Sequence, residues 1–466
     1  MPDGEPEPVF RRGNVSTVHR NPRGDRSVKV IASSQVARRD AFTGTLGTTL
    51  TLPMAALSLY LFVVHSYRLP LGWVGALAGL IGVLLQRRVR FPAPLLWVGA
   101  YLIWATLTAL QSPYPNEVQT NLIAFSKVWL IFLIGINAPR TKPQWNYLLL
   151  IWLALYALFP IRGILFNFVA GITTAGRYSW NFAWENPNDF ALITLPMLGL
   201  CVAILHGTPP KWARAGAVGG AIILPMSIML TQSRGGILAL ATVGTMLFLQ
   251  HRRRAQTMIL VLIAIGTLAV TAPVAVWSRM TKLASADTSN LGELDSSAEQ
   301  RFEIWKIAAA VSRDNILFGV GFGAYANANA AYARTRKFGS LARGHRSAHN
   351  SYLTLLAETG VVGLFLFIAF LVSLFRMALT RARELDEGDP STARQLRVLL
   401  VGILGFLQAA IFGSVFDTAF LFLHAALIIS LANVSQPSAG RLEVGNSYRR
   451  RRRPVYQGRA ASPRLQ

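Results

Sequence analysis

Four basic side chains lie within or beside apolar segments of the chain, where charge is costly: Lys127, Arg162, Arg177 and Arg234. An ionisable residue in a membrane span marks a functional site unless it is a snorkelling anchor or is paired with a carboxylate. Acids that could pair with these cations lie nearby along the chain: Glu117, Glu185, Asp189, Glu358 and Asp417. The planar guanidinium of arginine binds phosphate through two hydrogen bonds and stays protonated. The cations together therefore predict a pocket for a polyanion, such as a phosphate attached to a lipid.

His345 and His349 stand four residues apart, a spacing that can hold a metal when both lie on one side of a helix. Arg343 and Arg346 would repel a cation, and no Glu-x-x-His pattern accompanies the pair, so a metal site is disfavoured. A single histidine at a membrane boundary is more often a hydrogen-bonded structural residue than a catalyst. His349 is the stronger catalytic candidate, because it ends the longest polar loop. A neutral imidazole there would suit a proton acceptor for a hydroxyl group.

The chain that must position these residues has 466 amino acids, of which 52% are hydrophobic and 14% are charged. Soluble domains usually carry about 25% charged residues. The composition and a mean hydropathy of +0.40 exclude a disordered chain, a collagen-like fibre and an ordinary soluble enzyme. The single cysteine, Cys201, allows no intramolecular disulfide and no four-cysteine zinc site. Residues 1–42 are polar and lack the apolar core of a secretory signal peptide.

Twelve segments are apolar enough to serve as membrane-spanning helices, each of which needs about 20 apolar residues. They cover 44–65, 71–86, 92–111, 119–137, 146–167, 189–206, 215–232, 235–250, 256–277, 351–375, 397–415 and 419–434. Two of them (71–86 and 235–250) are short or glycine-rich, so the number of spans is expected to be twelve within one or two. The pattern predicts an all-α polytopic membrane protein with about 12 transmembrane helices.

The basic residues predict how these helices are oriented, because cytoplasmic loops carry more lysine and arginine. With the N-terminus in the cytoplasm, the short inner loops carry ten of them and the short outer loops three. The net charge of +25 then lies mostly on the cytoplasmic face, where it sets topology and attracts anionic lipid. Nucleic-acid binding is disfavoured, since the basic tails lack interleaved aromatic residues and a recognition module. Both termini are expected to be cytoplasmic and disordered.

The longest polar segment, residues 278–350, lies between the ninth and tenth predicted spans and faces outward. Ser296 and Glu299 form a capping box, which predicts an amphipathic helix over 297–313 at the outer membrane boundary. The glycine-rich run 317–323 follows no strand, so a tight turn packing on the membrane is favoured over a nucleotide site. The predicted organisation is a basic N-terminus (1–42), nine spans (43–277), a large periplasmic loop (278–350), three spans (351–434) and an Arg-rich tail (435–466).

Several short motifs occur in a fixed order along the chain. They are Asn186-Pro187-Asn188 after Arg177, residues 231–236, residues 299–302 with Trp305, residues 318–323, residues 349–353 and residues 356–360. Together they resemble the O-antigen ligase and O-antigen polymerase (WaaL/Wzy) superfamily, which includes the protein O-oligosaccharyltransferases. The resemblance runs from about residue 170 to residue 375. The apolar N-terminal spans match in character only, and the two basic tails are outside the pattern.

The resemblance implies a membrane glycosyltransferase of the bacterial inner membrane with a GT-C-like fold. Such an enzyme takes a glycan from undecaprenyl diphosphate at the periplasmic face and joins it, with inversion, to an acceptor hydroxyl without a metal or cofactor. Lipid A core, a growing polysaccharide or a protein would be the acceptor. The resemblance further implies that Arg177, Arg234 and Arg301 bind the diphosphate and that His349 is the base or orients the acceptor hydroxyl. Candidate supporting residues are Lys127, Arg162, Asn188 and Glu358.

Four functions stay open on the sequence. The first two are a ligase that moves a finished glycan, as in lipopolysaccharide biosynthesis, and a polymerase that adds repeat units to polysaccharide. They share donor and chemistry, and the motif layout favours the ligase. A multispan transporter or lipid flippase would explain buried charge, but the chain shows no internal repeat and such a protein needs no 278–350 loop. A structural membrane subunit would leave each outer arginine dispensable.

Overall fold

The computed structural model describes residues 50–66, 69–174, 176–180, 185–250, 291–335, 338–339 and 342–435. The side chains of 291–298 and 335 are not among the described parts. Three features predicted from the sequence lie outside these residues: the basic N-terminus 1–42, the ninth span at 256–277, and the tail after residue 435.

The described residues form helices joined by short connections, and the one β-contact among them is an isolated bridge between Thr174 and Arg177. The α-helices are α3 (Leu52–Ser66), α4 (Gly72–Leu84), α5 (Ala93–Thr108), α6 (Pro115–Asn137), α7 (Lys142–Tyr156), α8 (Arg162–Val169), α9 (Pro187–His206), α10 (Lys211–Leu230), α11 (Arg234–Gln250), α14 (Leu291–Asp314), α15 (Tyr325–Thr335), α16 (Ser351–Leu385), α17 (Pro390–Ala409) and α18 (Ala419–Val434). A π-helical turn, η1 (Ala157–Ile161), joins α7 to α8, and a 3-10 turn, η4 (Ala410–Phe412), follows α17. The predicted all-α character is confirmed for this part of the chain.

Six helical segments among the described residues are long and apolar enough to cross a membrane. They are α6, α7 continued through α8, α9, α10, α16, and α17 with η4. Five shorter apolar helices, α3, α4, α5, α11 and α18, also coincide with predicted spans. The total of twelve spans stays a prediction. The connection between the predicted spans 351–375 and 397–415 is mostly helical, because α16 continues to Leu385 and α17 begins at Pro390.

The centre of the bundle is the pair α9 and α17, whose buried faces cross closely. Gly199 on α9 and Gly402 on α17 make this approach possible. A Cβ atom on Gly199 would lie 3.2 Å from the carbonyl oxygen of Val398, and one on Gly402 would lie 3.2 Å from Cα of Pro196. Small residues at a helix crossing let two backbones pack directly. This crossing ties the start of α9 to the end of α17, and both of these ends reach the site described below.

The glycine-rich run 317–323 packs into a break in α16. Gly360 interrupts α16 with φ 68°. The carbonyls of Ala357 and Glu358 accept hydrogen bonds from the amides of Val320 (2.9 Å) and Gly321 (3.0 Å). Carbonyls at a helix end lack partners within the helix, and amides of the glycine-rich run donate hydrogen bonds to those at the break in α16.

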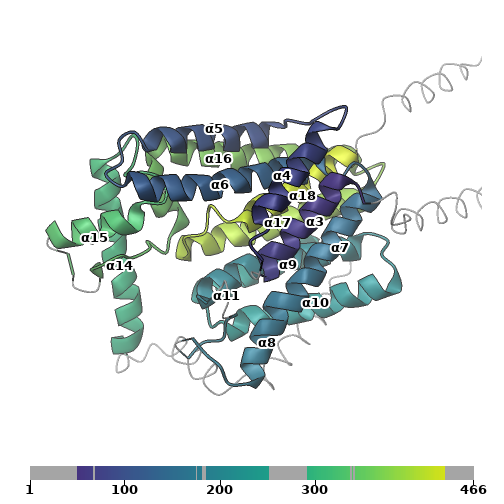
Figure 1. The fold of residues 1–466 in the computed structure, drawn as a ribbon. Coiled ribbons are helices and arrows are strands. Elements are labelled where there is room, and N and C mark those ends of the chain that lie inside the picture. Colours follow the sequence, from purple (N-terminus) through teal and green to yellow (C-terminus); the bar gives the residue numbers. More distant parts are fainter. Residues whose placement is uncertain are drawn as a thin grey trace, which may run out of the picture.

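Helix α14 differs from the expectation. It begins at Leu291, so Ser296 lies inside the helix and is not its N-cap. One face of α14 is buried, through Ile304, Ile307, Ala308 and Val311. This apolar face packs against α16, and α15 packs against α14 in turn. Figure 1 shows α14 and α15 together at one end of the long helices α5, α6 and α16. The helix therefore buries the side chains of this face against protein, whereas Phe302 on the same helix stays exposed.

Candidate functional site

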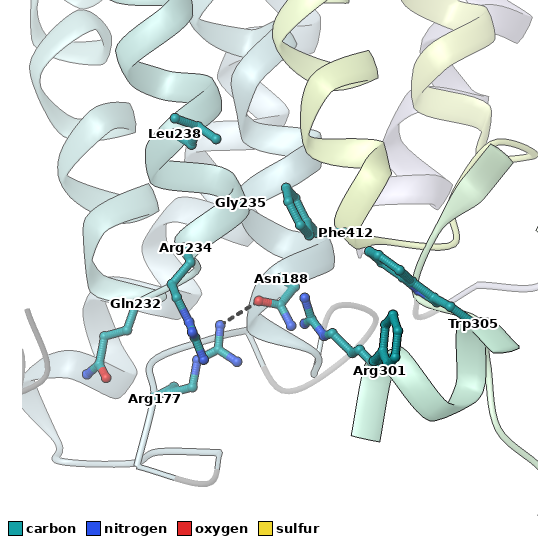
Figure 2. Close-up of a pocket in the computed structure, with 10 residues that line it drawn as sticks. Arg177, Asn188, Gln232, Arg234, Gly235, Leu238, Arg301, Trp305 and Phe412 are labelled. Carbon is teal, nitrogen blue, oxygen red and sulfur yellow. Dashed lines mark hydrogen bonds between the residues drawn. The ribbon is translucent and has the colours of Figure 1, made fainter. Parts of the chain in front are cut away.

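A cavity of about 380 Å³ lies where α9, α11, α14 and η4 meet. Its lining combines three arginines with an apolar wall: Arg177, Asn188, Gln232, Arg234, Gly235, Leu238, Arg301, Phe302, Trp305 and Phe412. Figure 2 shows the side chains of Arg177, Arg234 and Arg301 directed toward one space around Asn188, with Phe412 and Trp305 on one side. The residues that the sequence analysis assigned to a diphosphate are thus brought together by the fold.

Arg177 is held in place by two hydrogen bonds from its guanidinium group. Nε donates to the carbonyl oxygen of Thr231 at 2.8 Å, and Nη2 donates to Oδ1 of Asn188 at 2.8 Å. Asn188 is itself fixed in the first turn of α9, because the N-cap residue Asn186 accepts a hydrogen bond from its backbone amide. The preceding segment is closed by the bridge between Thr174 and Arg177. Both contacts leave part of the guanidinium facing the cavity, as Figure 2 shows.

Arg234 projects from a buried turn that connects α10 to α11. Thr231, Gln232 and Ser233 are buried, whereas Arg234 is exposed. The backbone of Gln232 adopts φ 51°, in the left-handed region that costs free energy for a non-glycine residue. After Arg234, Gly235 allows the start of α11 to approach Phe412, since a Cβ there would lie 2.6 Å from the phenyl ring. The turn therefore aims one cation into the cavity while its own polar groups are satisfied internally.

Arg301 reaches the cavity from α14, on the opposite side from Arg234. Burial and then the positive charge of Arg234 lower the pKa of Arg301, and the carboxylate of Asp189 acts in the opposite direction. Arginine nevertheless stays protonated in proteins. The cavity therefore concentrates positive charge, and Asp189 on α9 is an acid close enough to act on Arg301. Oδ1 of Asp189 is buried and has no hydrogen-bond partner among the described residues.

His349 lies beside this cavity in a strained and well-held loop. Its backbone has φ 47°, and it and Gln232 are the two non-glycine residues with positive φ in the part of the chain that the structure describes. On one side, the indole nitrogen of Trp305 donates a hydrogen bond to the carbonyl oxygen of Ala348 at 2.9 Å. On the other side, Asn350 caps α16 by accepting hydrogen bonds from the amides of Tyr352 and Leu353. His349 is thus fixed from both neighbours.

The electrostatic surroundings keep the imidazole of His349 neutral. Burial lowers the pKa of His349, and the positive charges of Arg301 and Arg346 lower it further. An imidazole with a lowered pKa is unprotonated at neutral pH and can accept a proton. Arg301 therefore links the two parts of the site, because it lines the cavity and acts on His349.

Three other candidate residues do not line this cavity. Lys127 on α6 is half-buried, with Nζ 5.7 Å from the ring centre of Trp73. Arg162 is exposed on α8. Glu358 is buried in α16, where Oε1 accepts a hydrogen bond from the backbone amide of Tyr325 at 3.2 Å. Its position under the glycine-rich run indicates a structural contact to the start of α15.

His345 is exposed. Among the residues that the structure describes, no group of three or more His, Cys, Asp or Glu side chains is arranged to hold an ion.

Two members of the site were missed by the sequence analysis. Phe412 comes from η4, and no local pattern connects it to arginines that lie more than 100 residues away. Leu238 was counted only as part of an apolar span. Asp189 was noted as a nearby acid but was not assigned to the site. Gln232 and Phe302 lie within the motifs, so the residue types and the order of the motifs could have identified them as part of the site.

The family model described as O-antigen ligase matches residues 219–368. A comparison with curated proteins gave no match. The matched region contains Arg234, Arg301, Trp305 and His349, and it ends within α16. Arg177, Asn188 and Phe412 lie outside it, and the fold brings them to the same cavity. The resemblance that the motifs indicated is confirmed by this match.

Proposed function

We propose that this member of the O-antigen ligase and polymerase superfamily transfers a glycan from undecaprenyl diphosphate to an acceptor hydroxyl at the outer face of the bacterial inner membrane. The observation that carries the proposal is the convergence of Arg177, Arg234 and Arg301 on one cavity beside His349. The match of residues 219–368 to the O-antigen ligase family model supports a membrane glycan ligase or polymerase. The lipid donor, the ligase reaction and the orientation in the membrane belong to the proposal.

The three arginines supply what departure of a diphosphate requires. When the bond between the anomeric carbon and the diphosphate oxygen breaks, the leaving oxygen keeps the electron pair and negative charge develops on it. Fixed positive charges around that position stabilise the transition state without rearranging. Arg177 is already oriented by Thr231 and Asn188, so little conformational freedom is lost when the donor binds.

His349 is proposed as the general base. The acceptor hydroxyl loses its proton to the neutral imidazole while its oxygen forms the new bond to the anomeric carbon. Attack opposite to the departing diphosphate inverts the configuration of that carbon. The lowered pKa of His349 fits this role, because a protonated imidazole could not accept the proton.

The apolar wall of the cavity suits a donor that carries a lipid. Leu238 and Phe302 have 54% and 59% of their surface exposed, and Phe412 and Trp305 continue the wall inward. A polyprenyl chain would contact these side chains from the outer leaflet while its diphosphate meets the arginines. This arrangement requires the cavity on the periplasmic side, which agrees with the excess of basic residues in the loops at the other ends of the helices.

The order of the motifs favours a ligase, with a polysaccharide polymerase as the alternative in the same superfamily. A transporter or flippase would not require a histidine with a lowered pKa next to the anion-binding cavity. Lipid A core, a growing polysaccharide and a protein are the candidate acceptors, and the donor diphosphate chemistry is the same for all three.

The decisive experiment is complementation in two bacterial hosts, one lacking its O-antigen ligase and one lacking its O-antigen polymerase. The wild type, His349→Ala and Arg234→Ala would be expressed at matched levels, and surface glycan would be read on gels. Arg313→Ala is the control, since Arg313 lies on α14 like Arg301 but is exposed and away from the cavity.

Glycan on lipid A core in the ligase-deficient host, lost in both test variants and kept in the control, supports the ligase. Recovery of chain length only in the polymerase-deficient host supports the polymerase. Wild-type activity retained by His349→Ala would contradict the assignment of the base. If neither host is complemented, an assay with a purified donor of defined structure would show whether the protein is inactive or whether the donors of both hosts are foreign to it.

A further inference from the structure

A second concentration of arginines lies at the far end of α6 from the glycine-rich run. Asn121, near the start of α6, contacts Gly323 of that run, and Asn137 at its end contacts Arg90. With 23 residues, α6 is about 34 Å long. Arg90 lies between α4 and α5, and Arg140 lies between α6 and α7. The proposed glycan transfer makes no use of either residue.

The backbone around Arg90 is held rigidly by one buried side chain. Oδ1 of Asn137 accepts a hydrogen bond from the backbone amide of Arg90 at 2.8 Å, and Nδ2 donates to the carbonyl oxygen of Arg90 at 3.1 Å. Asn137 is completely buried and also donates to the carbonyl oxygen of Leu133. This reciprocal pair of bonds fixes the loop between α4 and α5 against the end of α6.

Arg140 is anchored to the same loop from the other side. Its Nη2 donates to the carbonyl oxygen of Arg88 at 2.6 Å and to Oε1 of Gln86. Its backbone amide donates to Oε1 of Gln144 at 2.8 Å. All these partners are neutral. The neutral partners therefore hold the Arg140 guanidinium against the loop whose backbone Asn137 fixes at Arg90, and none of them balances the positive charge of either arginine.

The charge of this pair is uncompensated within the described residues. Arg90 and Arg140 are both half-buried, and neither forms an ion pair with a described carboxylate. Nη1 of Arg90 is buried and has no hydrogen-bond partner among the described residues. Burial and then the positive charge of Arg90 lower the pKa of Arg140, as expected for neighbouring like charges. Two neighbouring like charges, one of them anchored and the other with an unpaired donor, are features of an anion-binding site.

We propose that Arg90 and Arg140 bind one phosphate group. The planar guanidinium group of arginine favours bidentate hydrogen bonds to phosphate oxygens. This phosphate group is either the headgroup phosphate of an anionic phospholipid or free inorganic phosphate. The neighbouring surface favours the lipid, because Leu84, Leu85 and Phe91 beside the pair have 65%, 77% and 56% of their surface exposed. Basic sites flanked by apolar surface at helix ends are typical for anionic lipid headgroups.

The test uses the purified full-length protein in a neutral detergent and measures its melting temperature. The additions are phosphatidylglycerol, phosphatidylcholine or sodium phosphate, with the ionic strength held constant by chloride. The test variant is Arg90→Gln with Arg140→Gln. The control variant is Arg87→Gln with Arg88→Gln, which removes the same charge from the same loop but from two exposed side chains.

We expect phosphatidylglycerol to raise the melting temperature of the wild type and of the control, and phosphatidylcholine to have little effect. The test variant should need roughly tenfold more phosphatidylglycerol for the same shift, since it loses charge-assisted hydrogen bonds. An equal response to sodium phosphate would identify free phosphate as the ligand. Equal responses of test and control variants, or none in the wild type, would overturn the proposal.

If the double variant does not fold, a second measurement still tests the proposal. Native mass spectrometry of the wild type, exchanged into equal amounts of the two lipids, should show one retained phosphatidylglycerol in preference to phosphatidylcholine. Arg140→Lys keeps the charge but loses the planar fork, so it should retain less of that lipid than the wild type. Equal retention of both lipids by the wild type would overturn the site. None of these readouts depends on glycan transfer, so they stand apart from the proposed enzymatic activity.

Discussion

The indole nitrogen of Trp305 donates a hydrogen bond to the carbonyl oxygen of Ala348, at a distance of 2.9 Å. The same indole ring lines the cavity that the three arginines share. The bond joins α14 to the residue that precedes His349, whose own backbone is strained. One side chain thus connects the arginine-lined cavity to the loop that carries the proposed base.

Trp305→Phe should slow transfer roughly tenfold at saturating donor, with a much smaller change in donor KM. Phenylalanine keeps an aromatic wall but removes the N–H group that holds Ala348, so the imidazole of His349 loses its fixed position. A loss of about 1.4 kcal/mol in transition-state stabilisation corresponds to that factor. Steady-state transfer assays on purified protein would measure it. Trp212→Phe, an exposed position on α10, is the control, and equal rates in the two variants would contradict the role of Trp305.

Arg177→Lys should weaken donor binding by tenfold or more although the charge is kept. Lysine cannot donate simultaneously to the carbonyl of Thr231 and to Asn188 while facing the cavity, so the cation is no longer oriented. Binding of undecaprenyl diphosphate to the purified variant would report this directly. Lys211→Arg, an exposed change at the start of α10, provides a comparison at unchanged charge. Unchanged affinity of Arg177→Lys would show that charge alone suffices.

Transfer should stay active below the ordinary histidine pKa near 6.5 and should be lost only at more acidic pH. The reason is that burial, Arg301 and Arg346 lower the pKa of His349, and the base works only when unprotonated. Arg346→Gln removes one of these positive charges, so the pKa should rise and the acidic limb of the profile should move to higher pH. A rate–pH profile at low salt would measure the shift.

Arg343→Gln is the matched control for this profile, because Arg343 is exposed in the same loop and is not among the charges that act on His349. Its profile should superimpose on that of the wild type. A shift in the opposite direction for Arg346→Gln would rule out His349 as the titrating base.

Gly360→Ala should destabilise the protein by about 2 kcal/mol or more, through the left-handed backbone and through contact with the glycine-rich run. A Cβ at Gly360 would overlap the carbonyl oxygen of Leu317. Thermal unfolding in detergent would show a lower melting temperature. Gly216→Ala on α10, where a Cβ meets no atom within 4 Å, should be neutral or slightly stabilising. Similar melting temperatures for both variants would contradict the interlocked arrangement of Gly360 and Leu317.

Helix positions followed from the apolar runs because a membrane-type helix depends mainly on local composition and length. Segment 189–206, for example, appears as α9 (Pro187–His206), within two residues of its expected ends. The candidates Arg177, Arg234, Arg301 and His349 were named from residue type and motif order. Their roles stay predictions, but three of them do share a cavity.

Other features depend on contacts between distant parts of the chain, which no local pattern specifies. The hydrogen bond from Trp305 to Ala348 spans 43 residues, and the packing of Gly235 against Phe412 spans still more. The start of α14 was misplaced because the capping box at Ser296 and Glu299 is a weaker local signal than the packing of the helix on α16. The glycines of run 317–323 predicted a turn. They did not predict that amides of this turn would donate hydrogen bonds to carbonyls at the break in α16.

Apolar composition therefore determined that the chain is a helical membrane protein, and residue chemistry determined which cations and which histidine are candidates for the site. The tertiary structure decided which of them meet: it placed Arg177, Arg234 and Arg301 together and left Lys127 and Arg162 elsewhere. The physical reason is that the preference of a residue for a buried or a polar environment depends on its own side chain and its neighbours in the sequence. The distance between two side chains is set by how whole helices pack.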